Sequence, residues 1–175
     1  MQPNLDNVKK KIQENRDLID RITVKLPGFK GYVEKAESYA ADKIVRDLLA
    51  DRILGFKNEV NAKLVELEKK QERDKLGDLD SLTLKMETLI KKCQHADFGK
   101  TVTLSGITIS EDDKNRLLEY DWRLISSLDE MDKKIGELRP AAGETIGAAI
   151  SGIADTLRSF EKNFDERKNV LLEVI

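Results

Sequence analysis

The side chains best suited to chemistry are scarce in this chain. It holds one cysteine, Cys93, and one histidine, His95. A thiolate and an imidazole two residues apart could supply two ligands to a zinc ion, but a closed site needs four, and no second Cys/His pair exists. A di-iron site would require a glutamate three residues before the histidine, where Lys92 stands. We therefore predict no metal and no cofactor, with Cys93 in a helical core and His95 exposed beside it.

The other patterns that suggest catalysis are equally incomplete. The spacing from Gly143 to Gly147 lacks the Lys-Ser/Thr that ends a phosphate-binding loop, and it follows no strand. Asp121 falls at an apolar position of a helical repeat, so it is either a buried group that specifies packing or a residue outside the core. The uncertain register of the helix favours the second interpretation. We predict no catalytic residue and a chain that is not an enzyme.

Charge and composition narrow the partners. The chain has 175 residues, of which 31 are basic and 33 acidic, and the two signs are interspersed. Such a balance gives no electrostatic footprint for nucleic acid. A single cysteine fits a reducing cytoplasm, and Met-Gln-Pro-Asn at the start has no apolar run, so no signal peptide is expected. No stretch approaches eighteen apolar residues, so we expect no transmembrane span.

Helical periodicity accounts for most of the chain. Apolar residues spaced three and four apart predict helices over about 4–26, 32–75, 80–96, 111–138 and from about 140–145 to the C-terminal end. Pro27 and Gly28 end the first helix. The second is the longest, and Gly55 in its middle marks a bend or a close helix crossing.

One segment has a different pattern. Thr101–Leu104 and Ile107–Ser110 flank Ser105-Gly106, which predicts a β-hairpin with a two-residue turn. This pairing places Leu104 opposite Ile107 on one apolar face. An isolated two-stranded ribbon is marginal in water, so that face must cover the helices or a partner.

Together these elements predict an all-α fold. Short connections at both ends of the long helix favour antiparallel neighbours, and the last two helices should form a long hairpin. We expect an elongated antiparallel helical bundle of about five helices, with one long central helix over about 32–75 and a small β-hairpin near 101–110. No internal linker divides it, so residues 1–175 are predicted to form a single domain.

Two segments carry a resemblance. LPGFKGY at 26–32 is followed by EKAESYAADKIVRDLLADRI, and EDDKNRLLEYDWRLISSLDEM begins at Glu111. They resemble a group of uncharacterised prokaryotic all-helical proteins, in which a Pro-Gly-aromatic-x-Gly-Tyr turn precedes a long charged helix. The group has no established activity, so the resemblance carries over no catalytic residue. The Thr-rich hairpin departs from the group's pattern.

The function predicted from these features is a non-enzymatic interaction or scaffold role in the cytoplasm. The partner would be another protein or a second copy of the chain. One alternative is a peripheral membrane or envelope-stress adaptor that uses Lys9–Lys11, although the acidic residues of the same helix favour a solvated face. A second alternative is a small-ligand or metal-binding enzyme with an unrecognised site. The candidate partner contacts are Phe29, Tyr32, Leu104, Ile107 and Trp122.

Overall fold

Four long helices form the body of the molecule in a computed structural model that describes residues 13, 17–25, 38–96 and 111–173. They are α3 (Ser38–Lys69), α4 (Leu76–His95), α5 (Glu111–Leu138) and α6 (Glu144–Glu173). The described residues contain no strand, and they confirm an all-helical bundle. The β-hairpin predicted for 101–110 lies outside them.

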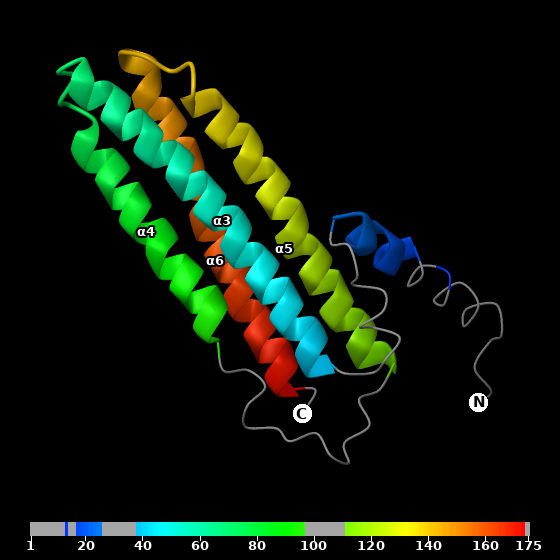
Figure 1. Cartoon of the computed structure of the whole chain (residues 1–175). Coiled ribbons are helices and arrows are strands. Elements are labelled where there is room, and N and C mark those ends of the chain that lie inside the picture. The colour runs from blue at the N-terminus through cyan, green and yellow to red at the C-terminus, as the bar shows by residue number, and fades with distance from the viewer. Residues whose placement is uncertain (1–12, 14–16, 26–37, 97–110, 174–175) are drawn as a thin grey trace.

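The helices alternate in direction along the chain, so α3 and α5 run one way and α4 and α6 the other (Figure 1). The main contacts join α3 to α4 and α5 to α6, and lesser contacts join α3 to α5 and α4 to α6. Seen along its axis, the bundle is therefore a square in which α3 and α6 occupy opposite corners. The predicted hairpin of the last two helices is confirmed as the α5/α6 pair.

The core follows the predicted apolar repeats, because residues three and four apart share one face of a helix. The repeat of α6 is buried without a break from Ile146 to Phe164. Phe160 and Phe164 stack with their ring centroids 6.3 Å apart. Fully enclosed side chains come from every helix: Leu49, Ile53, Val60, Leu79, Met86, Leu124, Met131, Ile135, Ile153 and Phe160.

The long helix is shorter at its C-terminal end than predicted. It ends at Lys69, not near residue 75. Gln71 adopts a positive φ of 60°, and the amides of Gln71 and Glu72 donate to the carbonyls of Glu68 and Leu67 at 3.0 Å each. This is a Schellman closure, in which glycine is the usual left-handed residue. Because glutamine takes that place, the sequence did not reveal the stop. Gly77, two residues beyond the end predicted for this helix, lies inside α4.

The middle of α3 also differs from expectation. Gly55 is exposed and lies inside an unbroken helix, and a Cβ built on it would meet no atom within 4 Å. Among the described helices, none crosses closely at this point, so the predicted close crossing is wrong. Glycine is therefore not required here by packing.

The N-terminal part of the described chain is helical at residues 17–25. Ile22 in this stretch is fully buried in the core. Lys25 binds Asp129 of α5 at 2.9 Å, and Asp129 also lies 3.7 Å from Arg52 of α3. The stretch thus packs beside α5, as the blue segment in Figure 1 shows. All described helices contribute to one apolar core, while the assignment of the whole of 1–175 to one domain stays a prediction.

Candidate functional site

The strongest concentration of buried polar groups is a layer that crosses the bundle near one end. It takes one residue from each helix: Arg46 from α3, Cys93 from α4, Asp121 from α5 and Arg167 from α6. All four side chains are buried. We call this set the polar layer. It lies far along each helix from the turns that join α3 to α4 and α5 to α6.

An ion pair forms the α5/α6 half of the polar layer. Nε of Arg167 donates to Oδ1 of Asp121 at 2.5 Å, and the two residues are 0% and 4% exposed. The interpretation of Asp121 as a residue outside the core is therefore wrong. Asp121 stays inside because a guanidinium from the neighbouring helix neutralises its charge and offers it a hydrogen bond.

Arg46 forms the α3/α4 half of the polar layer. Its Nη1 donates to the backbone carbonyls of Cys93 and Gln94 at 3.0 and 3.2 Å. These carbonyls belong to the last turn of α4, where helical carbonyls lack partners and carry partial negative charge. The buried guanidinium therefore caps α4 from the side and fixes the end of α4 against α3.

Cys93 is fully buried and lies close enough to both arginines to feel their charges. Burial raises the pKa of its thiol from 9.0 to about 12, against the opposing effect of the positive charges of Arg46, Arg167 and Lys92. A protonated, enclosed thiol is a poor nucleophile and a poor metal ligand. His95 is exposed, and the described residues hold no group of three or more metal-ligating side chains. The hydrogen bonds of the polar layer each join two helices.

Lys63 gives α3 a second buried cation at the opposite end of the bundle. Its Nζ donates to the carbonyl of Arg139 at 3.2 Å and lies 3.1 Å from the Glu66 carboxylate. The Arg139 guanidinium in turn binds both carboxylate oxygens of Glu59 at 2.6 Å. The end of α5 is therefore fastened to α3 through both backbone and side chain.

The sequence held a signal for some of these groups. Arg167 follows Phe164 by three residues, so it stands at a core position of the α6 repeat, as Asp121 does in α5. Two opposite charges at core positions of successive helices predict a buried pair. Arg46 and Lys63 gave no such signal, since the apolar repeat of α3 runs beside them. The repeat pointed to Leu64, which is half-buried, while Lys63 buries its aliphatic stem.

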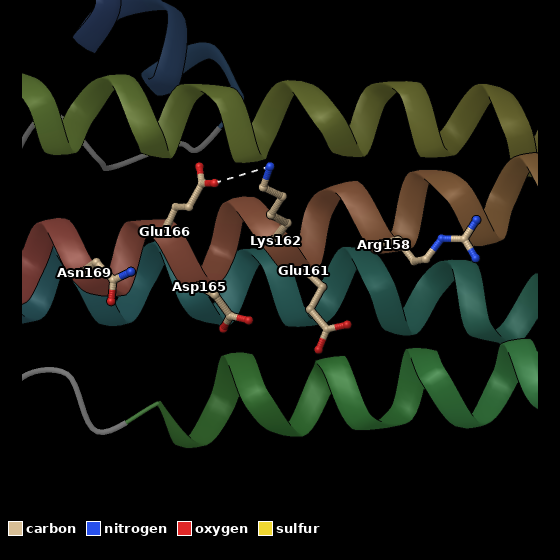
Figure 2. Close-up of a pocket in the computed structure, with 6 residues that line it drawn as sticks. All are labelled: Arg158, Glu161, Lys162, Asp165, Glu166 and Asn169. Carbon is tan, nitrogen blue, oxygen red and sulfur yellow. Dashed lines mark ion pairs between the residues drawn. The ribbon is translucent and has the colours of Figure 1, made fainter.

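A shallow hollow on the outer side of α6 is also lined by polar groups (Figure 2). Glu161 and Asp165 point toward α4, whose Lys92 binds them at 3.0 and 2.8 Å. Lys162 and Glu166 point toward α5 and lie 3.8 Å apart. The carboxylates are therefore engaged with lysines on an open surface. Nothing in this arrangement shields a reacting group from water.

The predicted partner contacts are only partly visible. Phe29, Tyr32, Leu104 and Ile107 lie outside the described residues. Trp122 lies on α5, half-buried and packed against the core. A role for it in partner binding stays a prediction.

Comparisons with known proteins add no assignment. A scan of protein-family models and searches of curated proteins and solved structures found no match. The resemblance to prokaryotic all-helical proteins therefore stays a prediction. Among the described helices, none combines the length and apolarity needed to cross a membrane.

Proposed function

We propose that this chain is a non-enzymatic helical-bundle protein whose surface serves protein–protein contacts, in the cytoplasm. A bundle of this kind is compatible with many roles, so the argument rests on its polar groups and not on its fold. The cytoplasmic setting is supported by the single cysteine, which is a free, buried thiol.

The observation that carries the proposal is the use of the buried polar side chains. Arg46 and Lys63 bind helix ends, and Asp121 and Arg167 bind each other across two helices. An enzyme usually gathers such groups around a pocket, where desolvation and unusual partners tune them for reaction. Here the same groups fix the positions of the helices, which leaves the surface as the part available to partners.

Cross-linking in cells that express the chain tests the proposal. A lysine-reactive cross-linker, followed by mass spectrometry, is expected to join surface lysines of this chain to another polypeptide or to a second copy. The purified protein provides the opposing arm. Divalent metal ions, nucleotides and common metabolites at about 1 mM are expected to leave the melting temperature unchanged, because a ligand that binds the folded state raises it.

Two outcomes would overturn the proposal. One is the absence of any cross-link between polypeptides, together with a melting temperature raised by one of the small ligands, which would favour the enzyme alternative. The other is flotation with anionic liposomes that is abolished by changing Lys9, Lys10 and Lys11 to glutamate, which would favour the membrane adaptor. Protein cross-links with neither effect support the proposal.

A further inference from the structure

Three large apolar side chains stand exposed on one side of the bundle. Leu54 and Val65 of α3 are 43% and 44% exposed, and Leu84 of α4 is 65% exposed. They belong to the two helices with the most extensive mutual contact. An exposed apolar surface rimmed by polar residues is typical of an interaction site.

The orientation of the α3/α4 pair places these residues on a common face. Lys57 and Asn61 stand on the side of α3 next to α4, since they contact Glu87 and Thr83 at 3.3 and 3.5 Å. Because each residue turns a helix by about 100°, Leu54 is rotated about 60° outward from Lys57, and Val65 about 40° outward from Asn61. Leu84 is about 200° from the buried Leu82, which points it away from the core. We call the surface made by these outward residues of α3 and α4 the outer face.

Along α3, the apolar residues and amides of the outer face follow a symmetric order, and the two ends of the series carry opposite charges. On α3 it runs Asp51, Leu54, Asn58, Asn61, Val65 and Lys69. Asn61 is half-buried at the edge next to α4, and the other five side chains in this series are exposed. Turning the helix end for end exchanges the two apolar residues, the two amides, and the acid with the base. A surface that is complementary to itself in this way fits a two-fold interface.

The register of α4 agrees with the same two-fold axis. The contacts of Lys57 with Glu87 and of Asn61 with Thr83 place Leu84 level with residue 60 of α3. Residue 60 lies within one residue of the midpoint between Leu54 and Val65, the two exposed apolar residues of α3. The axis therefore passes beside Leu84, and two copies bring their Leu84 side chains together.

We propose that the outer face binds the outer face of a second copy of this chain, with α3 antiparallel to its counterpart. The proposal rests on the proposed function and names its partner. The face is about 30 Å long and two helices wide, which gives about 600 Å² per copy. Interfaces somewhat below the standard size of about 800 Å² per partner give weak complexes. The expected species is a dimer in rapid exchange with monomers.

The charges add support from the rim of the face. In the part of the chain that the structure describes, neither Asp51 nor Lys69 takes part in an ion pair, although both lie on a highly charged helix. The second copy supplies the opposite charge to each. Two such pairs related by the axis fix the antiparallel direction, because a parallel arrangement would set like charges together.

Sedimentation velocity of the full chain between about 1 and 100 μM tests the dimer. The wild-type chain is expected to shift from monomer to dimer over this range. Leu84→Lys is expected to weaken the dimer at least about tenfold, since it places two cations at the axis. Val24→Lys is the matched control: Val24 is an exposed valine on the stretch 17–25, outside the outer face, and its change leaves the dimer intact.

A charge swap tests the register. Asp51→Lys and Lys69→Asp are each expected to weaken the dimer, and the two changes together are expected to restore it. Leu84→Cys is expected to form a disulfide-linked dimer on oxidation, while Val24→Cys does not, and buried Cys93 does not interfere. Circular dichroism confirms that each exposed substitution keeps the fold.

A wild-type chain that stays monomeric at about 100 μM overturns the proposal, as does equal weakening by Leu84→Lys and Val24→Lys. A charge swap that fails to restore the dimer overturns the antiparallel register. If cross-links to other polypeptides persist, these results overturn the dimer and leave the proposed function intact. Loss of all cross-links in cells would overturn both the dimer and the proposed function.

Discussion

The two buried cations of α3 make the same kind of contact in two different environments. Arg46 and Lys63 each bind backbone carbonyls at the C-terminal end of a neighbouring helix. Arg46 does so inside the polar layer, beside the fully buried Cys93 and Arg167. Lys63 does so at the edge of the bundle, where it shares its charge with Glu66, a carboxylate whose side chain is 40% exposed.

The difference lies in how much water each end retains. At the Lys63 end, an exposed carboxylate and solvent can replace a lost partner. At the Arg46 end, the neighbours are enclosed side chains and backbone groups, so a lost partner leaves a desolvated polar atom. We therefore expect the stability of the bundle to depend more strongly on the polar layer than on the Lys63 end.

The largest effect is expected from breaking the ion pair of the polar layer. Arg167→Met should cost about 3–5 kcal/mol in the free energy of unfolding, because it leaves the Asp121 carboxylate buried without its guanidinium. Replacing both residues, with Asp121→Leu and Arg167→Met, should recover most of that loss, since apolar side chains of similar size avoid the desolvation of two charges. Urea unfolding followed by circular dichroism measures both values. If the double variant is as unstable as Arg167→Met alone, the loss does not come from an unpaired Asp121 carboxylate, and this explanation is wrong.

The next effect compares the two cations directly. Arg46→Met should lower the free energy of unfolding by about 2–3 kcal/mol, and Lys63→Met by about 1 kcal/mol. Only the first change leaves buried carbonyls without a hydrogen-bond donor and without access to water. Reaction of Cys93 with a thiol reagent locates the loss. Native protein should react slowly, since burial raises the pKa of this thiol to about 12. Arg46→Met should speed the reaction, and Lys63→Met should leave it nearly unchanged. If Cys93 reacts at the same rate in Arg46→Met and Lys63→Met, the two ends of the bundle do not differ in the way proposed.

A smaller effect of opposite sign is expected midway between the cations. Gly55→Ala should stabilise the protein by about 1 kcal/mol, because alanine favours the helix and the added Cβ meets no atom. Since Gly55 touches neither end, the gain should be the same in the Arg46→Met and Lys63→Met backgrounds. A denaturation series on the combined variants measures this additivity. A gain that differs between the backgrounds would indicate that strain passes along α3.

The smallest effect concerns pH and the Lys63 end. A hydrogen bond from Arg139 lowers the pKa of Glu59 from its ordinary value of 4.5. The stability that this pair contributes is present above pH 4.5 and is lost as the pH falls through the lowered value. Glu59→Gln should therefore lower the melting temperature slightly near neutral pH, and the difference from wild type should close at low pH. Glu137→Gln, whose partner Lys134 is on its own helix, is the control. A difference that persists in acid would argue against the pair.

The sequence predicted the features that repeat along a single helix and missed those that depend on two. The repeat of α6 from Ile146 to Phe164 was predicted and is buried, because periodic burial needs no knowledge of the neighbour. The partner of Asp121 was missed, although Arg167 stands at a core position of α6, because the register between the two helices follows only from packing. The end of α3 was missed because Gln71 takes a conformation usually left to glycine.

Charged residues posed a different difficulty. Arg46 and Lys63 are two among 31 basic residues, and nothing in their spacing separates them from those on solvated faces. Their burial depends on where α4 and α5 end, which brings carbonyls to them. Residues such as Leu104 and Ile107 lie outside the described part of the chain, so their predicted role as partner contacts still awaits an experiment.

The placement of the buried bonds has a consequence for the order of folding. Arg46 joins α3 to α4, and Arg167 joins α6 to α5, so each bond closes within one pair of consecutive helices. Both arginines can therefore find these partners before the two pairs meet, so docking buries groups that already have hydrogen bonds. The two bonds span 47 and 46 residues, and each hairpin must form along its length before its bond can close. We therefore expect that two helical hairpins, each joined by a buried hydrogen bond at the end away from its turn, form before the bundle closes.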